Sequence, residues 1–259
     1  MIPQARARVA GHFGEWMQGR LGSDGPIALV TVSCPALYVE VTLSGDGDVQ
    51  IVQPDPAPLP PAQAARLLTA LGYSARGSLH VTATMAPGRG AGASTAALVA
   101  LARAFGARDA DAIARACCTV EGESDPVMHD APERLLWAPR SAEVLERLPA
   151  APSVEVIGGF LGDGEMTDPE DTAFPDISDL IPQWRRASET GDAMLFARCA
   201  SLSARRTTAL RGPSDDPTAA LAQVLGAIGH IRAHTGSARG LLFPTGGVPS
   251  GAKGALREA

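Results

Sequence analysis

Apolar and polar positions alternate in short runs over the first third of the chain. Such runs are typical of strands with one buried face. A run of five prolines between positions 54 and 63 rules out regular structure there and predicts a connecting loop. The predicted strands cover residues 27–32, 36–43, 48–53 and 78–85.

Apolar residues at helical spacing follow the proline-rich loop, and an alanine- and leucine-rich helical stretch follows the glycine-rich turn after the fourth strand. Residues 153–160 and 236–243 return to a strand pattern, whereas 126–152 predicts short helical pieces and 162–175 an exposed acidic loop. Because strict alternation of strand and helix is missing, we predict an α+β architecture with lobes at 1–150 and 151–259. Helices are predicted at 62–73, about 94–105 and 108–120, and three more between 177 and 234 with breaks near Gly191 and at 211–217.

Composition narrows the class of protein. The formal net charge of −6 argues against nucleic acid as a partner, because phosphate backbones require a clustered basic surplus. No apolar run approaches the ~18 residues that predict a membrane span, and the N-terminus lacks the apolar segment of a signal peptide. We therefore expect a cytoplasmic protein. The four cysteines have neither zinc-site nor disulfide-framework spacing and predict buried, reduced thiols.

The most informative run is MAPGRGAGASTAALVALARAF, at 85–105. Its three glycines lie between a predicted strand and a helix, where positive φ angles allow a backbone to wrap a phosphate. Ser94 and Thr95 stand at the helix start, where free N–H groups favour an anion. A P-loop is excluded because Lys253 is the only lysine in the chain. The structural alternative is a tight turn with a Ser/Thr cap.

Two further segments carry chemistry. GHFGEWMQG, at 11–19, places Glu15 and Gln18 between glycines. A buried carboxylate without a partner is costly, so Glu15 is expected to face a ligand, a cation or solvent. TVEGESDPVMHD, at 119–130, crowds four carboxylates, which repel unless a cation or water separates them. The simpler interpretations are a solvated turn and an exposed acidic loop.

Taken together these segments resemble the motifs of the galactokinase, homoserine kinase, mevalonate kinase and phosphomevalonate kinase (GHMP) superfamily. Its phosphate-binding pattern PxxxGLxSSAA is similar to Pro87, Gly90, Gly92, Ser94, Thr95, Ala96 and Ala97, without the leucine and with a shifted proline. The run at 11–19 resembles the G-x-x-GE-x-x-QG form of kinases linked to propanediol utilisation and cobalamin synthesis, and AHTGSARGLLF at 233–243 resembles the third motif.

The resemblance implies a fold with a mixed N-terminal lobe, a ferredoxin-like C-terminal lobe and an active site between them. It also implies ATP and Mg²⁺ as cofactors. Asp125 is expected to accept the proton of the substrate hydroxyl, or only to orient that hydroxyl, and Arg89 to add charge to the phosphates. Nucleotide-binding residues would be Pro87, Gly88, Arg89, Gly90, Ala91, Gly92, Ala93, Ser94 and Thr95. Metal ligands would come from Ser94 or Thr95 and from Glu121 or Glu123, and substrate contacts from Glu15, Gln18, Gly236 and Ser237.

The expected activity is phosphorylation of a small alcohol by ATP, with L-threonine as acceptor. One departure bears on the acceptor, because Ala97 stands where the threonine kinase relatives carry an aspartate. Homoserine or a sugar is the alternative acceptor, and a non-catalytic nucleotide-binding module is the alternative class. The expected partner is a small molecule, with neither nucleic acid nor membrane, and a homodimer stays an open option.

Overall fold

The computed structural model describes residues 5–164, 168–213 and 215–258. Strands are β1 (Ala5–Arg20), β2 (Ile27–Ser44), β3 (Gln50–Val52), β4 (Ser78–Ala83), β5 (Leu135–Ala138), β6 (Glu143–Arg147), β7 (Val154–Phe160), β8 (Gly229–Arg232) and β9 (Ala238–Pro244). Helices are α1 (Pro61–Ala70), α2 (Ala93–Ala104), α3 (Ala110–Glu121), η1 (Pro132–Arg134, a 3₁₀ turn), α4 (Leu180–Thr190), α5 (Ala193–Arg211), α6 (Thr218–Val224) and α7 (Ala252–Glu258).

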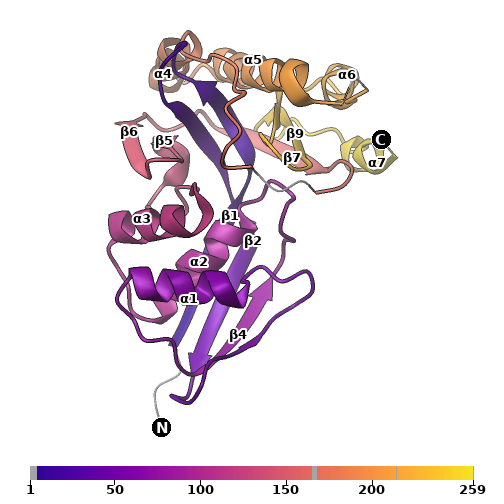
Figure 1. The fold of residues 1–259 in the computed structure, drawn as a ribbon. Coiled ribbons are helices and arrows are strands. Elements are labelled where there is room, and N and C mark those ends of the chain that lie inside the picture. The colour runs from indigo at the N-terminus through magenta and orange to yellow at the C-terminus, as the bar shows by residue number, and fades with distance from the viewer. Residues whose placement is uncertain (1–4, 165–167, 214, 259) are drawn as a thin grey trace.

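One sheet runs through the whole described molecule, in the order β3-β4-β2-β1-β8-β9-β7. Its centre is the long antiparallel hairpin of β1 and β2, which extends from the lower half of the molecule to the upper half (Figure 1). β1 also pairs with β8 at Glu15 and Arg232, and this pairing joins the first strand to the last third of the chain. The expected α+β class is confirmed.

Helices cover the sheet in two groups (Figure 1). In the lower half α2 is almost wholly buried against β1 and β2, and its alanines allow the close approach. In the upper half α4 and α5 pack around a second core that contains Trp16, Trp184 and Phe196. Strands β1 and β2 supply residues to both cores, so the lower and upper halves of the molecule share the first part of the chain. The lobe boundary near residue 150 stays a prediction.

Three local predictions were wrong. The two strands expected at 27–32 and 36–43 form one continuous strand, β2. Pro35 lies at a register shift in the pairing of β2 with β1, between Cys34 and Tyr38, where its missing N–H removes no interstrand hydrogen bond. The stretch at 126–152 forms the β5–β6 hairpin beyond its 3₁₀ turn. The last of the three helices expected between 177 and 234, which follows the break at 211–217, ends at Val224. Residues 229–232 are instead strand β8, which pairs with β9 and β1.

The exposure of individual side chains corrects two other expectations, one for the cysteines and one for residues 162–175. Cys117 and Cys199 are buried free thiols, whereas Cys34 and Cys118 are only half-buried. The stretch at 162–175 is not wholly an exposed loop, because Phe174 lines a cavity; its residues 165–167 lie outside the described part. Among the described residues, no helix has both the length and the apolar composition that crossing a bilayer requires.

Candidate active site

A left-handed glycine turn leads from β4 into α2. Gly88, Gly90 and Gly92 have φ angles of 76°, 72° and 69°, which side chains rarely adopt. A Cβ atom on Gly92 would also lie 2.5 Å from Cδ2 of His12. The turn is bound to β1 by backbone hydrogen bonds from His12 N–H to Ala91 O (3.1 Å) and from Gly14 N–H to Gly90 O (3.3 Å). Glycine is therefore required here both by conformation and by space.

Two hydroxyl groups at the start of α2 meet a carboxylate at the end of α3. Ser94 donates a short hydrogen bond to Glu121, and Thr95 Oγ1 donates to Glu121 Oε2 at 3.1 Å. Burial raises the pKa of Glu121 to about 7; the hydrogen bonds from Ser94 and Thr95 act against this rise, and the negative charge of Asp125 adds to it. A cation in this place would relieve that cost.

His12 lies between two carboxylates. Its Nε2 is 3.2 Å from Asp125 Oδ2, and its Nδ1 is 3.7 Å from Glu15 Oε1. The imidazole is 3% exposed and Glu15 is 7% exposed. The three side chains form an ionisable group, hereafter the His12 cluster, in which His12 and Glu15 are buried and the Asp125 side chain is 23% exposed. The cluster contacts the glycine turn through Gly92.

Opposing effects set the charges of the His12 cluster. Burial lowers the pKa of His12, but Asp125 and then Glu15 outweigh it, and the result is a pKa of about 9. Burial raises the pKa of Glu15 to about 7, against the attraction of His12. For Asp125, burial is outweighed by the charge and hydrogen bond of His12, and its pKa falls below the ordinary value. At neutral pH Asp125 is thus an anion paired with an imidazolium.

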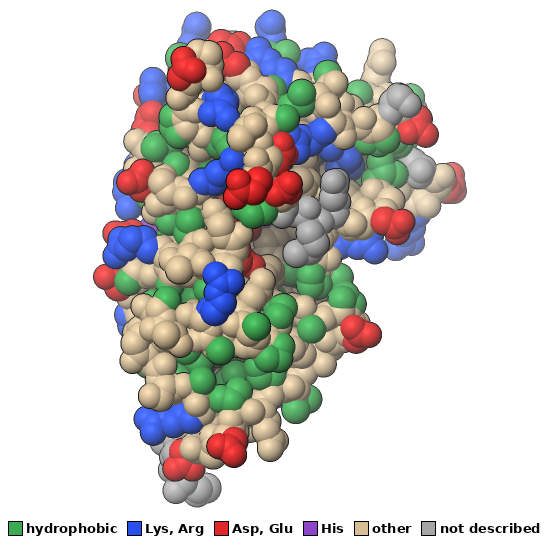
Figure 2. All heavy atoms as spheres, in the orientation of Figure 1, with side chains coloured by type: hydrophobic (Ala, Val, Ile, Leu, Met, Phe, Trp, Pro, Cys, Tyr) green, Lys and Arg blue, Asp and Glu red, His purple; other side chains and the backbone are tan. Residues whose placement is uncertain are grey.

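These groups line one cavity of about 330 Å³ between the two halves of the molecule. The glycine turn, the end of α3 and the following loop form one side, and β1 forms another. Figure 2 shows the hollow on one face, with acidic side chains along its upper edge. The lining residues among the predicted set are Glu15, Gln18, Gly88, Gly90, Ala91, Gly92, Ala93, Ser94, Thr95, Glu121, Glu123 and Asp125.

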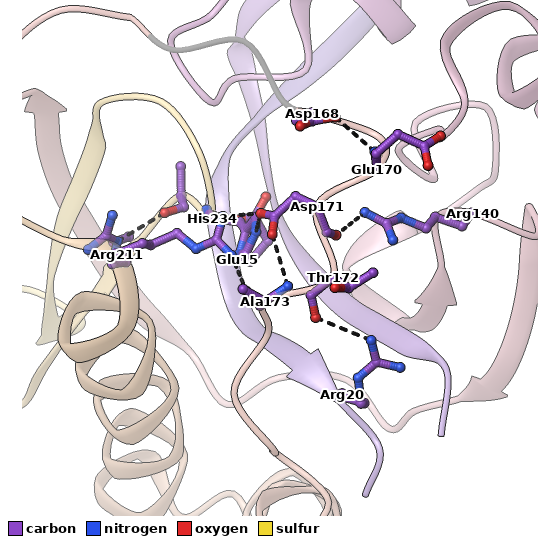
Figure 3. Close-up of polar contacts among 12 residues, drawn as sticks. Glu15, Arg20, Arg140, Asp168, Glu170, Asp171, Thr172, Ala173, Arg211 and His234 are labelled. Atoms are coloured by element: carbon purple, nitrogen blue, oxygen red, sulfur yellow. Dashed lines mark hydrogen bonds and ion pairs between the residues drawn. The ribbon is translucent and has the colours of Figure 1, made fainter. Parts of the chain in front are cut away.

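The upper wall of the cavity is an aromatic pair supported by arginines. The rings of Phe174 and His234 are stacked, with centroids 3.8 Å apart and planes 6° apart. Burial and then the charge of Arg211 lower the pKa of His234 to about 3, so its ring is neutral. Arg211 and Arg140 bind the segment beside Phe174 through the Asp171 carboxylate and carbonyl respectively (Figure 3).

The same segment is attached to the first strand. Arg20 Nη2 donates to Thr172 O at 3.3 Å (Figure 3), and the backbone N–H of Arg20 donates to Pro175 O at 2.8 Å. The hydrogen bond of the Arg211 side chain lowers the pKa of Asp171 to about 2, so this carboxylate is ionised at neutral pH. β1, the β5–β6 hairpin and α5 thus together fix the position of Phe174.

Four predicted residues lie elsewhere. Pro87 and Arg89 are not among the described residues that line the cavity, and Arg89 Nη1 donates to Gly162 O at 2.6 Å. Gly236 packs on the glycine turn, where a Cβ atom would lie 2.4 Å from Gly90 N, and Ser237 N–H donates to Arg89 O at 3.2 Å. Gly236 and Ser237 therefore support the turn, while His234 and Thr235 reach the cavity.

Sequence reasoning missed His12, Phe174 and Asp171. His12 was within reach, because it belongs to the 11–19 motif and lies three residues before Glu15. That motif is not a turn but part of β1, where irregular pairing with β2 between Ala10 and Met17 turns His12 and Glu15 toward one cavity. Phe174 had no local signal.

Comparison with known proteins separates sequence from fold. No protein-family model matches the chain, and no curated protein matches it in sequence. Solved structures do match over almost the whole chain. Mevalonate kinase from Staphylococcus aureus MRSA252 has a TM-score of 0.61 at 14% identity, covering 98% of this chain and 94% of that one. Phosphomevalonate kinase from Streptococcus pneumoniae has a TM-score of 0.64 at 10% identity, covering 100% of this chain and 95% of that one.

A putative homoserine kinase from Listeria monocytogenes is also similar, with a TM-score of 0.58 at 16% identity and coverage of 99% of this chain and 92% of that one. The chain therefore has the two-lobed α+β fold of the GHMP kinases, with a mixed N-terminal lobe and a ferredoxin-like C-terminal lobe. The cavity described above lies between these lobes.

Proposed function

We propose that this chain is an ATP-dependent kinase that phosphorylates the hydroxyl group of a small alcohol, with L-threonine as acceptor. One observation carries the proposal. The glycine turn, the Ser94 and Thr95 hydroxyls with Glu121, and the His12 cluster all line the same cavity. Such a cavity offers a phosphate cradle, oxygen ligands for a cation and a carboxylate for an alcohol.

The turn and the start of α2 would hold the triphosphate of ATP. Backbone N–H groups at a glycine-rich turn and the positive end of a helix dipole stabilise anions without a lysine. Ser94 or Thr95 with Glu121 fits Mg²⁺, which favours oxygen ligands and usually combines one or two carboxylates with phosphate oxygens and water. Bound there, Mg²⁺ would neutralise phosphate charge. Within the described residues no group of three or more His, Cys, Asp or Glu side chains could hold a metal.

Glu15 and Gln18 suit the amino group of an acceptor. Glu15 Oε2 accepts from His234 N–H at 3.1 Å, and its burial disfavours the ionised form. Gln18 Nε2 donates to Arg232 O at 3.2 Å, while its buried Oε1 has no partner among the described residues. An ammonium group beside them would give Glu15 a counter-charge and Gln18 Oε1 a donor. An amino-acid acceptor thus explains two otherwise costly features.

Asp125 would orient the acceptor hydroxyl for in-line attack. The acceptor oxygen forms a bond to the γ-phosphorus of ATP as the bond to the ADP oxygen breaks, and the hydroxyl proton leaves to Asp125 or to a phosphate oxygen. A carboxylate with a lowered pKa is a weak base, which favours orientation over early proton removal. His12 would hold Asp125 ionised and in position. Most of the rate would come from positioning and electrostatics.

Homoserine is the second candidate acceptor. Two similar solved structures carry that name, from Listeria monocytogenes (putative) and Cytophaga hutchinsonii. Ala97 favours this alternative, because the threonine kinases that residues 11–19 resemble carry an aspartate at that position. Both acceptors present an ammonium group to Glu15 and Gln18, so they differ in how far the hydroxyl lies from that anchor.

ADP release in the presence of Mg-ATP tests the proposal. L-threonine, L-serine, L-homoserine, 1-amino-2-propanol and galactose are compared at equal concentration. We expect L-threonine to give the highest kcat/KM, and galactose, which lacks an amino group, to give none. Release with another alcohol alone would keep the kinase and reject threonine. ATP binding without turnover of any acceptor would instead indicate the non-catalytic module.

The amino-group contact is tested by Glu15→Gln. Removing the carboxylate should raise KM for the amino-acid acceptor more than KM for ATP. Glu40→Gln is the control, because Glu40 lies on β2 and pairs with Arg6 and Arg8, away from the cavity. Equal effects of E15Q on both KM values would contradict the assignment.

A further inference from the structure

A second cavity, of about 340 Å³, lies in the upper half between α5, α6, β8 and β9. None of the residues that line it belongs to the predicted site. Figure 2 shows basic side chains gathered in the upper half of the molecule, where these elements lie. Its polar lining residues include Arg205, Thr208, Asp216, His230, Arg232 and Arg239.

This basic cavity contains an excess of buried positive charge. Arg232 is 5% exposed and Arg239 is 7% exposed, although arginine is almost never fully buried without a partner. Arg205 adds a third guanidinium from the exposed side of α5. Asp216 is the carboxylate among the described residues that line the cavity. The formal balance is thus three arginines against one acid, in a protein of net charge −6.

That acid is already engaged. Arg239 Nε is 2.8 Å from Asp216 Oδ2, and Thr218 N–H donates to Asp216 Oδ1 at 3.0 Å. The hydroxyl of Thr218 also donates to Oδ1. The pairing with Arg239 therefore uses one oxygen of Asp216, and Thr218 uses the other.

The hydrogen-bond acceptors that the described residues offer to Arg232 and Arg205 are all neutral. Arg232 Nε donates to Ala233 O at 3.1 Å, and Nη1 donates to Thr208 Oγ1 at 2.9 Å. Arg205 Nε donates to Ser201 O at 3.3 Å. Burial and then the charge of Arg239 lower the pKa of Arg232 to about 10, and the charges of Asp216 and Glu15 offset this only in part. A buried cation without a hydrogen-bonded counter-ion is costly, and a bound anion would reduce that cost.

We propose that the basic cavity binds a small phosphoryl dianion, either inorganic phosphate or a phosphomonoester. The planar fork of arginine matches phosphate oxygens, and two forks supply the charge of a dianion. The volume lies at the lower end of the range for small-molecule sites, which suits a small ligand. His230 adds an uncharged ring, because burial and then the charge of Arg205 lower its pKa to about 4.

The basic cavity is connected to the candidate active site by one strand. His230 and Arg232 of β8 line the basic cavity, and His234 and Thr235 line the other. The Arg232 carbonyl accepts the hydrogen bond of Gln18, and Arg232 pairs with Glu15 in the ladder. An anion bound to Arg232 therefore acts on the strand that positions the proposed acceptor site. The binding proposal itself does not depend on kinase activity.

Calorimetric titration with sodium phosphate tests whether the basic cavity binds the anion. Sodium phosphate replaces sodium chloride in the buffer so that the ionic strength stays constant. The variants are Arg205→Gln and, as matched control on the same helix, Arg198→Gln; both arginines are exposed, so neither change should unfold the protein. We expect Arg205→Gln to weaken phosphate binding roughly tenfold or more, the usual effect of losing a charged hydrogen-bond donor, and Arg198→Gln to leave it unchanged.

A second variant, Arg232→Lys, keeps the charge but removes the fork, and should weaken binding again with an unchanged circular dichroism spectrum. Equal phosphate affinity in the wild type, R205Q and R232K would overturn the proposal, since it would place the phosphate at the glycine turn. Absence of phosphate binding to the wild type would also overturn it. Tighter binding of glycerol 3-phosphate than of phosphate would identify a phosphomonoester as the ligand, and equal binding would identify inorganic phosphate.

Discussion

The two cavities share strand β8 and its continuation, but they carry opposite charge. The candidate active site holds four carboxylates against the imidazolium of His12, because the ring of His234 is neutral; the carboxylates are those of Glu15, Glu121, Glu123 and Asp125. The basic cavity holds three arginines against Asp216. In each, burial leaves ionisable groups short of counter-charge, which raises the pKa of Glu15 and Glu121 and lowers that of Arg232.

The two cavities differ in how far apart in the sequence their charged residues lie. Glu121 is the last residue of α3 and Asp125 lies in the loop that follows, while Ser94 and Thr95 both belong to the first turn of α2. Much of the candidate active site is therefore local in sequence. The arginines of the basic cavity come from α5, β8 and β9 and meet only after folding. Buried charge without enough counter-charge points to a ligand site in both cavities. A motif search finds the residues of the candidate active site, which are close in sequence, but misses those of the basic cavity, which are not.

The largest expected effect is that of Asp125→Asn. Removing the charge would leave His12 without its nearest carboxylate and the acceptor hydroxyl without its proposed orienting group. We expect kcat to fall roughly 10²–10⁴-fold, the usual contribution of a positioned acid–base group. Steady-state ADP release measures it. Asp130→Asn, an exposed residue of the same loop, is the control, and near-full turnover of D125N would refute the role of Asp125.

In the basic cavity the matching change is Asp216→Asn. The side chains of Asp216 and Arg239 are 4% and 8% exposed, so the variant leaves a buried guanidinium unpaired. We expect the free energy of unfolding to fall by about 3–5 kcal/mol, measured by urea denaturation. Added phosphate should restore part of it. The exposed Asp215→Asn is the control, and an equally small loss in both would show that the pair is unimportant.

Glu121→Gln distinguishes the two candidate metal-binding glutamates. Because Glu121 accepts from both Ser94 and Thr95, its loss should lower kcat/KM with Mg-ATP roughly 10²–10³-fold, as for other preorganised electrostatic contacts. Glu123→Gln should have a smaller effect. The Mg²⁺ concentration for half-maximal rate should rise in E121Q alone. A larger effect of E123Q would assign the metal to Glu123.

The smallest expected effect is a pH dependence carried by His12. Its pKa of about 9 exceeds the ordinary 6.5, so the folded state binds this proton more tightly than the unfolded state. The resulting stabilisation is complete below pH 6.5 and is lost as pH rises through about 9. The difference in unfolding free energy between wild type and His12→Gln should therefore shrink over that range, by roughly 1–3 kcal/mol. A pH-independent difference would contradict the ion pairing.

Much of the fold was predictable from local pattern. The long apolar stretch of α2, the glycine turn before it and the alternation in β4 all depend on neighbours in sequence, and the structure contains each of them. The failures were at long-range pairing. GHIR at 229–232 is too short to show a period, and it is a strand because β9 and β1 lie on its two sides.

Local sequence is enough to indicate which residues bring chemistry: glycines where φ must be positive, hydroxyls at a helix start, and carboxylates crowded at the end of α3 and in the loop after it. Which charges meet depends on the tertiary structure. It placed His12 between Glu15 and Asp125, stacked Phe174 on His234, and turned Arg205, Arg232 and Arg239 into one cavity. The physical reason is that backbone conformation depends on near neighbours, whereas charge pairing and burial depend on segments that only folding brings together.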